Sequence, residues 1–239
     1  AYINLGWLLN WQINNDWRLT AGVDVTHFSN GNTHYPNAGV NTVGGRVSLI
    51  RTFGTHSYRT SVESRRKARA EIERYFSYDV VLYGVTRRKG IIWPDDRVLV
   101  PGAFGVAGIN INPMYNLNAC FRAGISLDAQ YDESANIKDH VVGDDRSAEN
   151  IRFYRPPFRE QFGVGLSLRA ELVMPIFSIN LGVGHNVFYQ GEDLKGFYQI
   201  AALKTSITRR LFLHVGYQLR NFKDPNNLML GLGYRFNGR

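Results

Sequence analysis

The chain has 239 residues, a formal net charge of +8 and a single cysteine, which excludes an internal disulfide. No stretch approaches the roughly 20 apolar residues that a transmembrane helix needs, so any membrane role must come from strands. The positive charge indicates an acidic partner, and because no zinc-finger spacing or RNA-binding signature occurs, we expect anionic lipid head groups rather than nucleic acid.

Apolar and polar residues alternate with a period of two along nearly the whole chain, which predicts β-strands. In 160–172, for example, the even positions from Phe162 to Leu172 are apolar, and the odd positions hold glycine, serine and charge. The predicted strands are 2–12, 17–29, 40–53, 78–89, 98–116, 119–131, 160–173, 176–189, 197–208, 211–221 and 228–236.

Segments of about ten residues with one apolar and one polar face are typical of a membrane-spanning β-barrel. A soluble β-sandwich would show similar alternation. The barrel is favoured because the polar faces carry glycine and charge, as a watery lumen allows, and because aromatic residues gather at strand ends, as a membrane interface requires. We therefore predict an all-β, antiparallel transmembrane barrel of the outer membrane, with 1–239 as a single domain.

The strand count is odd, whereas bacterial single-chain barrels have an even number of strands. Short turns such as Arg209-Arg210 predict the periplasmic side, and the long charged segment 132–159 predicts an extracellular loop. On this topology strand 2–12 would run down from outside, and strand 228–236 would end in the periplasm. We therefore expect at least one further strand before Ala1, and a chain that is the C-terminal portion of a longer protein.

Residues 55–77 interrupt the strand pattern. The segment is rich in arginine, and Ser64 to Tyr75 has the pattern of a helix. It could be an amphipathic plug or a membrane-surface helix; a solvated basic loop is the favoured interpretation.

Candidate catalytic residues stand at the end of strand 17–29. His27 and Ser29 share its apolar face, and Asn41 on the next strand can lie beside His27. Ester hydrolysis needs a nucleophile, a base, a group that orients the base, and donors for the oxyanion. Ser29, His27 and Asn41 could fill the first three roles, and Asn30 and the backbone of Gly31 could supply the donors.

A His-x-Ser pair alone is a weak signal. The whole stretch from Val25 to Asn32, followed by Pro36 to Asn41, resembles the PagL-type lipid A 3-O-deacylase family, including its longer acyloxyacyl hydrolase relatives of Bacteroidota. The resemblance implies an outer-membrane barrel whose outer wall carries an active site that cuts an ester-linked acyl chain from lipid A. It also implies Ser29 as nucleophile and His27 as base, with Asn30 helping the oxyanion.

One departure concerns the third member. The shorter family members have a glutamate where this sequence has Asn41, which can hold an imidazole tautomer but cannot stabilise imidazolium by charge. The rival hypothesis is therefore a non-catalytic barrel, either a pore or a structural subunit of an envelope assembly, that retains the motif. In the loop after Ser29, we take Asn32, His34 and Asn37 as candidate contacts to the lipid A or lipopolysaccharide head group.

No cofactor or metal is implied by the remaining polar residues. His185 and His214 fall on different strands, and the acidic cluster of Asp139, Asp144, Asp145 and Glu149 matches no calcium-binding loop. The inward charges are expected to satisfy one another in the lumen. They are Arg122, Asp128, Arg169 and Glu171.

Overall fold

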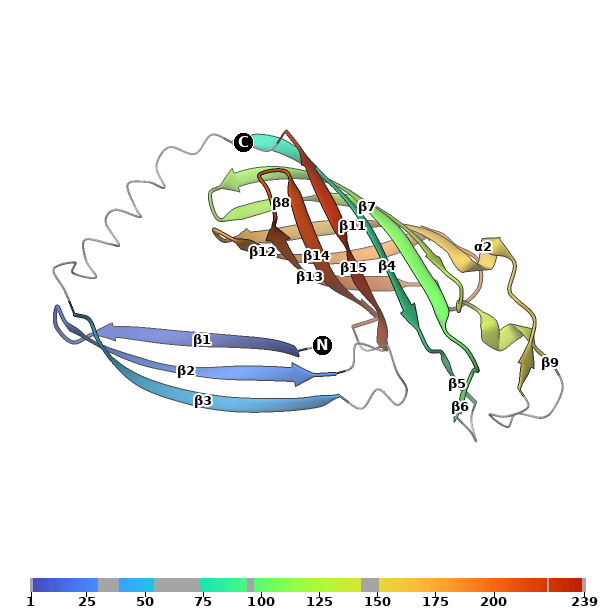
Figure 1. Cartoon of the computed structure of the whole chain (residues 1–239), viewed down its shortest axis with the longest axis horizontal. Helices are drawn as coiled ribbons and strands as arrows, with labels where there is room; N and C mark the ends of the chain where they lie inside the picture. The colour runs from blue at the N-terminus through green and yellow to red at the C-terminus, as the bar shows by residue number, and fades with distance from the viewer. Residues whose placement is uncertain are drawn as a thin grey trace. The chain divides into compact units, whose positions relative to one another are not determined.

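The computed structural model describes residues 2–29, 39–53, 74–93, 97–142, 151–222 and 224–237, which form two compact units (Figure 1). The first unit is a three-stranded antiparallel sheet in the order β1-β2-β3. Its strands are β1 (Tyr2–Gln12), β2 (Trp17–Phe28) and β3 (Val40–Arg51). Across the described residues, no helix is both long and apolar enough to pass through a membrane.

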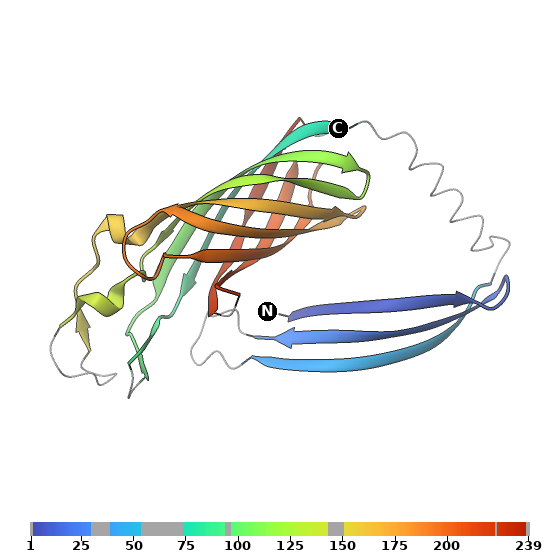
Figure 2. The ribbon, with the colours of Figure 1, turned by 180° about the vertical axis from the view of Figure 1, so that it is seen from behind.

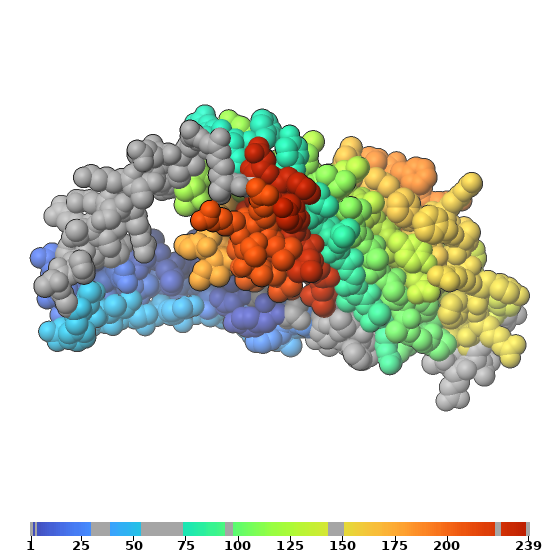
Figure 3. Space-filling view, turned by 45° about the horizontal axis from the view of Figure 1, so that its top comes forward, coloured from blue at the N-terminus to red at the C-terminus, as the bar shows by residue number. Residues whose placement is uncertain are grey.

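The second unit is a closed antiparallel barrel of eight strands in the order β11-β12-β13-β14-β15-β4-β7-β8 (Figure 2). These strands are β4 (Tyr75–Arg87), β7 (Phe104–Asn118), β8 (Phe121–Asp132), β11 (Phe162–Val173), β12 (Phe177–Phe188), β13 (Phe197–Ser206), β14 (Leu211–Arg220) and β15 (Asp224–Phe236). Closure comes from the pairing of β15 with β4, where Tyr234 is opposite Val80. The seam is visible where β15, in red, lies beside β4, in teal (Figure 3).

The structure differs from the single barrel expected over 1–239. The predicted strands exist at nearly the predicted positions, but eight of them close by themselves into a barrel with an even number of strands. Alternation along a strand fixes which face each residue occupies, and it carries no information on which distant strand completes the sheet. The pairing of β4 with β15 is such a long-range choice.

The barrel has apolar residues outside and polar residues inside, the reverse of a soluble protein. On β11, Leu168 is 71% exposed on the outer wall, whereas Arg169 and Glu171 point inward and are at most 4% exposed. This arrangement matches lipid outside and a polar interior, and it confirms the predicted class of outer-membrane β-barrel.

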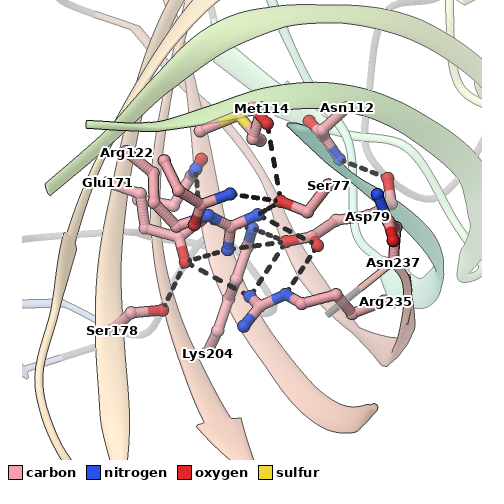
Figure 4. A network of polar contacts seen from close by, with 12 residues as sticks. Ser77, Asp79, Asn112, Met114, Arg122, Glu171, Ser178, Lys204, Arg235 and Asn237 are labelled. Carbon is pink, nitrogen blue, oxygen red and sulfur yellow. Dashed lines mark hydrogen bonds and ion pairs between the residues drawn. The ribbon is translucent and has the colours of Figure 1, made fainter. Parts of the chain in front are cut away.

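The lumen is filled by ion pairs between its walls (Figure 4). Arg122 lies 2.9 Å from Glu171 and 3.2 Å from Asp79, and Lys204 bridges the same two carboxylates at 2.7 and 3.0 Å. A second cluster joins Arg169 to Asp128 at 2.7 Å. The expected pairing of the inward charges is therefore confirmed, and each carboxylate has a cationic partner.

The two ends of the barrel differ. One end has short turns, such as the two residues between β7 and β8, and the other carries the longer connections. Those connections include β5 (Gly90–Ile92), β6 (Arg97–Leu99), the 3-10 helix η1 (Ile137–His140), β9 (Val141–Val142), β10 (Arg152–Phe153) and α2 (Phe158–Gln161). Their apolar side chains form a small core together with the first residue of β7. It contains Ile91, Val98, Val100, Phe104, Ile137 and Ile151.

The segment predicted as the long loop 132–159 is therefore partly ordered into η1, β9, β10 and the start of α2. Asp139 of the acidic cluster lies in η1, whereas Asp144, Asp145 and Glu149 fall outside the described residues. The predicted helix within 55–77 also falls outside them, except for its last residues, which lie at Arg74 and the start of β4.

Candidate functional site

The sheet β1-β2-β3 has one polar and one apolar face. On the polar face Asn4 donates a hydrogen bond to Thr26 at 2.6 Å, and Arg46 pairs with Asp24 at 3.3 Å. On the apolar face the side chains are largely exposed, with Trp7 80% accessible. The other exposed apolar residues of this face are Leu5, Leu9, Trp11, Val23, Val25, Val43, Val47 and Leu49. The sheet thus has the same division of faces as the wall of the eight-stranded barrel.

His27 and Asn41 meet across the β2–β3 pair. The register places them directly opposite each other, and His27 Nδ1 lies 2.7 Å from Asn41 Oδ1. An amide oxygen only accepts hydrogen bonds, so Nδ1 carries the hydrogen and, in the neutral ring, Nε2 carries the lone pair. The free nitrogen is therefore the one that can take a proton from a nucleophile. On the apolar face, the His27–Asn41 pair lies next to the Val25–Val43 pair.

Ser29 follows the last residue of β2 and is half-buried. Strand parity predicts that its side chain continues the row of Val25 and His27. The other candidates, namely Asn30, Gly31, Asn32, His34 and Asn37, fall outside the described residues.

The opposite end of the same face is marked by a cluster of aromatic and cationic side chains. The guanidinium of Arg51 lies 5.4 Å from the ring centroid of Trp17 and 4.8 Å from that of Phe53. Such amphipathic side chains gather where hydrocarbon meets water. The apolar face is therefore bounded by this cluster at one end and by His27 at the other.

The two other histidines considered from the sequence do not belong to a common site. His185 is exposed on the outer wall against the ring of Phe197, and His214 is buried in the lumen. Over the ranges that the structure describes, there is no group of three histidine, cysteine or acidic residues that could hold a metal ion.

Sequence profiles of known families match both units. The profile described as acyloxyacyl hydrolase, C-terminal domain, matches residues 76–238, which is the eight-stranded barrel and more than half of the chain. The profile described as lipid A 3-O-deacylase (PagL) matches residues 4–49, which is the sheet that carries His27 and Asn41. The chain belongs to the PagL-type acyloxyacyl hydrolase family. It is accordingly an outer-membrane protein of a family of hydrolases that act on lipid A.

Two further comparisons add no functional detail. Among solved structures, the chain resembles Ail, the attachment invasion locus protein of Yersinia pestis, which was solved in complex with the heparin analogue sucrose octasulfate. The identity is 15%, the TM-score is 0.37, and the match covers 67% of this chain and 98% of Ail. No curated protein matches the sequence.

Proposed function

We propose that this PagL-type protein is an esterase that removes an ester-linked acyl chain from lipid A or a related glycolipid. The observation that carries the proposal is the 2.7 Å contact between His27 Nδ1 and Asn41 Oδ1 on the apolar face of the sheet that matches the PagL profile. That contact leaves Nε2 of the ring free to act as a base, two residues from a serine on the same side of the strand.

The proposed reaction has two steps. The Oγ of Ser29 attacks the ester carbonyl while His27 Nε2 takes the hydroxyl proton, and the same nitrogen returns that proton to the departing sugar hydroxyl. Water then attacks the acyl carbonyl on Ser29 while His27 Nε2 takes its proton, and the same nitrogen returns that proton to Ser29 Oγ as the fatty acid leaves. Asn41 holds the ring in the tautomer that both steps need. Asn30 and the backbone N–H of Gly31 are assigned to the oxyanion.

Head-group contacts are assigned to the loop that follows Ser29. Asn32, His34 and Asn37 carry hydrogen-bonding side chains next to the reacting residues in the sequence. Sugar hydroxyls and phosphates of a glycolipid are suitable partners for these groups.

The height of His27 in the membrane supports a lipid substrate. From Trp17 to His27, strand β2 rises by about 33 Å, and a strand tilted by about 40° would cover roughly 25 Å of hydrocarbon. If the Trp17 and Arg51 cluster lies at one interface, His27 lies at the other, where the ester bonds of a lipid are found. The turn 13–16 is short, as periplasmic turns are, so we assign the His27 end to the outer leaflet.

The test is mass spectrometry of lipid A from cells that produce the wild-type chain or the variant Ser29→Ala. We expect the wild type to release an acyl chain and Ser29→Ala to leave lipid A intact. Ser48→Ala is the matched control, because Ser48 belongs to β3 but faces away from His27, and it should behave as the wild type.

A non-catalytic barrel is the second candidate, because the neutral Asn41 replaces the charged third member of the shorter relatives. Identical acylation patterns in cells with the wild type and Ser29→Ala would favour this candidate and defeat the esterase proposal.

A further inference from the structure

We infer that Gly39 is a positioning residue for His27, and this inference rests on the proposed function. Gly39 immediately precedes β3, and a side chain at this position would meet the imidazole of the neighbouring strand. The absence of a side chain at position 39 leaves the space that the ring needs in order to reach Asn41.

The contact distances show how little room remains. A Cβ atom at position 39 would lie 3.0 Å from His27 Cε1 and 3.2 Å from the carbonyl oxygen of Phe28. Carbon atoms in contact prefer a separation of about 3.5–4.0 Å, so either the ring or the strand would have to move.

Space, and not backbone conformation, explains the glycine. A positive φ is recorded for Gly102, Gly191 and Gly196 among the described glycines and not for Gly39, so the contact with His27 is what explains a glycine at position 39. Among the described residues, the methyl group of an alanine at position 39 would collide with His27 and Phe28 of the neighbouring strand.

The imidazole is the part that would give way. Strand β2 is hydrogen-bonded to β1 on one side and to β3 on the other, so its backbone is fixed. The His27 ring, by contrast, is a side chain that donates a hydrogen bond to Asn41 and can turn about χ2. Because Cε1 joins the two ring nitrogens, a push on this atom moves both the bond to Asn41 and the nitrogen that accepts the proton.

Gly45 provides a matched control. It lies on the same strand as Asn41 and on the same face, and no heavy atom lies within 4 Å of a Cβ built at this position. The exchange Gly45→Ala therefore makes the same chemical change as Gly39→Ala in open space.

The experiment compares the full-length wild type, Gly39→Ala and Gly45→Ala in lipid A hydrolysis and in ¹⁵N NMR of labelled histidine, with His27→Gln to assign the signal. We expect Gly39→Ala to lower kcat at least tenfold with KM within twofold, and to remove the Nδ1–H tautomer of His27. Gly45→Ala should keep kcat within twofold and retain the tautomer. In the wild type, a nuclear Overhauser contact between Gly39 Hα and His27 Hε1 should be present whether or not Gly39→Ala folds.

The outcomes separate the two proposals. Unchanged kcat and an unchanged His27 signal in folded Gly39→Ala, or no Gly39–His27 contact in the wild type, would overturn the positioning role and leave the esterase proposal standing. If the wild type hydrolyses nothing while the tautomer of His27 still changes in Gly39→Ala, the positioning of the ring holds and the esterase proposal fails.

Discussion

Asn41 gives the His27 ring only part of what a carboxylate would give. Its amide oxygen accepts the Nδ1 hydrogen at 2.7 Å and so selects the tautomer. It has no negative charge to stabilise the imidazolium that forms when Ser29 loses its proton. A serine hydroxyl depends strongly on its base, so an amide in place of a carboxylate at position 41 should limit kcat for ester hydrolysis.

We expect Asn41→Glu to raise kcat for lipid A hydrolysis, because a carboxylate at this position would stabilise the charged ring. Asn41→Ala should lower kcat about tenfold, which corresponds to about 1.4 kcal/mol of barrier, because nothing would then orient the imidazole. Steady-state kinetics of both variants check this. A tenfold drop in Asn41→Glu would mean that the amide has a role besides orienting the ring.

Around His27, the sequence predicted the neighbouring residue Asn41 but not the close contact with Gly39. The parity of strands 17–29 and 40–53, taken as neighbours, was enough to place Asn41 beside His27, as the register shows. The contact with Gly39 could not be predicted, because it depends on where the chain enters β3 and on the direction of the imidazole. The only available signal was the glycine within the stretch from Pro36 to Asn41.

The polar side chains of the barrel strands point into the lumen. The charged groups there are neutralised by partners from several different strands. Asp79 on β4 is shared by Arg122, Lys204 and Arg235, which come from three other strands. The sequence placed Arg122 and Glu171 on inward positions and predicted their pairing. It missed Asp79, Lys204 and Arg235, because the contacts of Asp79 with Lys204 and Arg235 require β15 to close on β4.

Removing one carboxylate from this network should destabilise the barrel. We expect Glu171→Gln to cost about 3–5 kcal/mol of unfolding free energy, because Arg122, Lys204 and Arg235 would then share the single buried carboxylate of Asp79. Glu192→Gln is the control: Glu192 pairs with Lys195 at 3.2 Å on the exposed surface, and its loss should cost at most about 1 kcal/mol. Urea unfolding of the folded chain in lipid vesicles measures both. Equal midpoints for the two variants would contradict the role of the lumen network.

The connection between β12 and β13 depends on Asp193. Burial raises the pKa of this carboxyl, but the charge and hydrogen bond of Lys89 at 2.7 Å, the backbone N–H of Asn136 and the charge of Arg220 together lower it below its ordinary value of 3.8. A carboxyl whose pKa is lowered by folding stabilises the fold above its unfolded pKa, and this contribution is lost as the pH falls through the folded value.

We therefore expect residues 189–196 to lose protection from hydrogen exchange as the pH falls below about 4, with little change between pH 5 and 8. Asp193→Asn should show the weaker protection already at neutral pH. Hydrogen exchange read by mass spectrometry, corrected for the intrinsic pH dependence of exchange, provides the measurement. Equal protection at pH 7 in Asp193→Asn and the wild type would disprove the role of Asp193.

At the scale of the whole molecule, the sequence predicted the strands but not their division into two units. Each strand carries a local signal, namely its alternation and the turn residues that follow it. Closure is decided by the complementarity of strand edges and lumen side chains that lie far apart in the chain. The folded pieces of 132–159 were missed for a related reason, because their apolar residues Ile137 and Ile151 share one cluster with residues of β5, β6 and β7.

The eight-stranded unit should not conduct ions. Its interior is occupied by side chains from opposite walls, and Asp79 and Glu171 are completely buried. In planar lipid bilayers, we expect the purified chain to give the same current as protein-free membranes. Stepwise conductance would show that the network opens, and would strengthen the hypothesis of a pore.

The pairing of β15 with β4 also has a consequence for biogenesis. The barrel closes only when β15 pairs with β4, which brings Phe236 opposite Tyr78, more than 150 positions earlier in the sequence. Until then, both strands expose rows of unpaired amides, so ring closure is the late and slow event in assembly. The polypeptide therefore has to be protected from self-association before it closes. A mispairing of β15 with β4 would prevent closure of all eight strands.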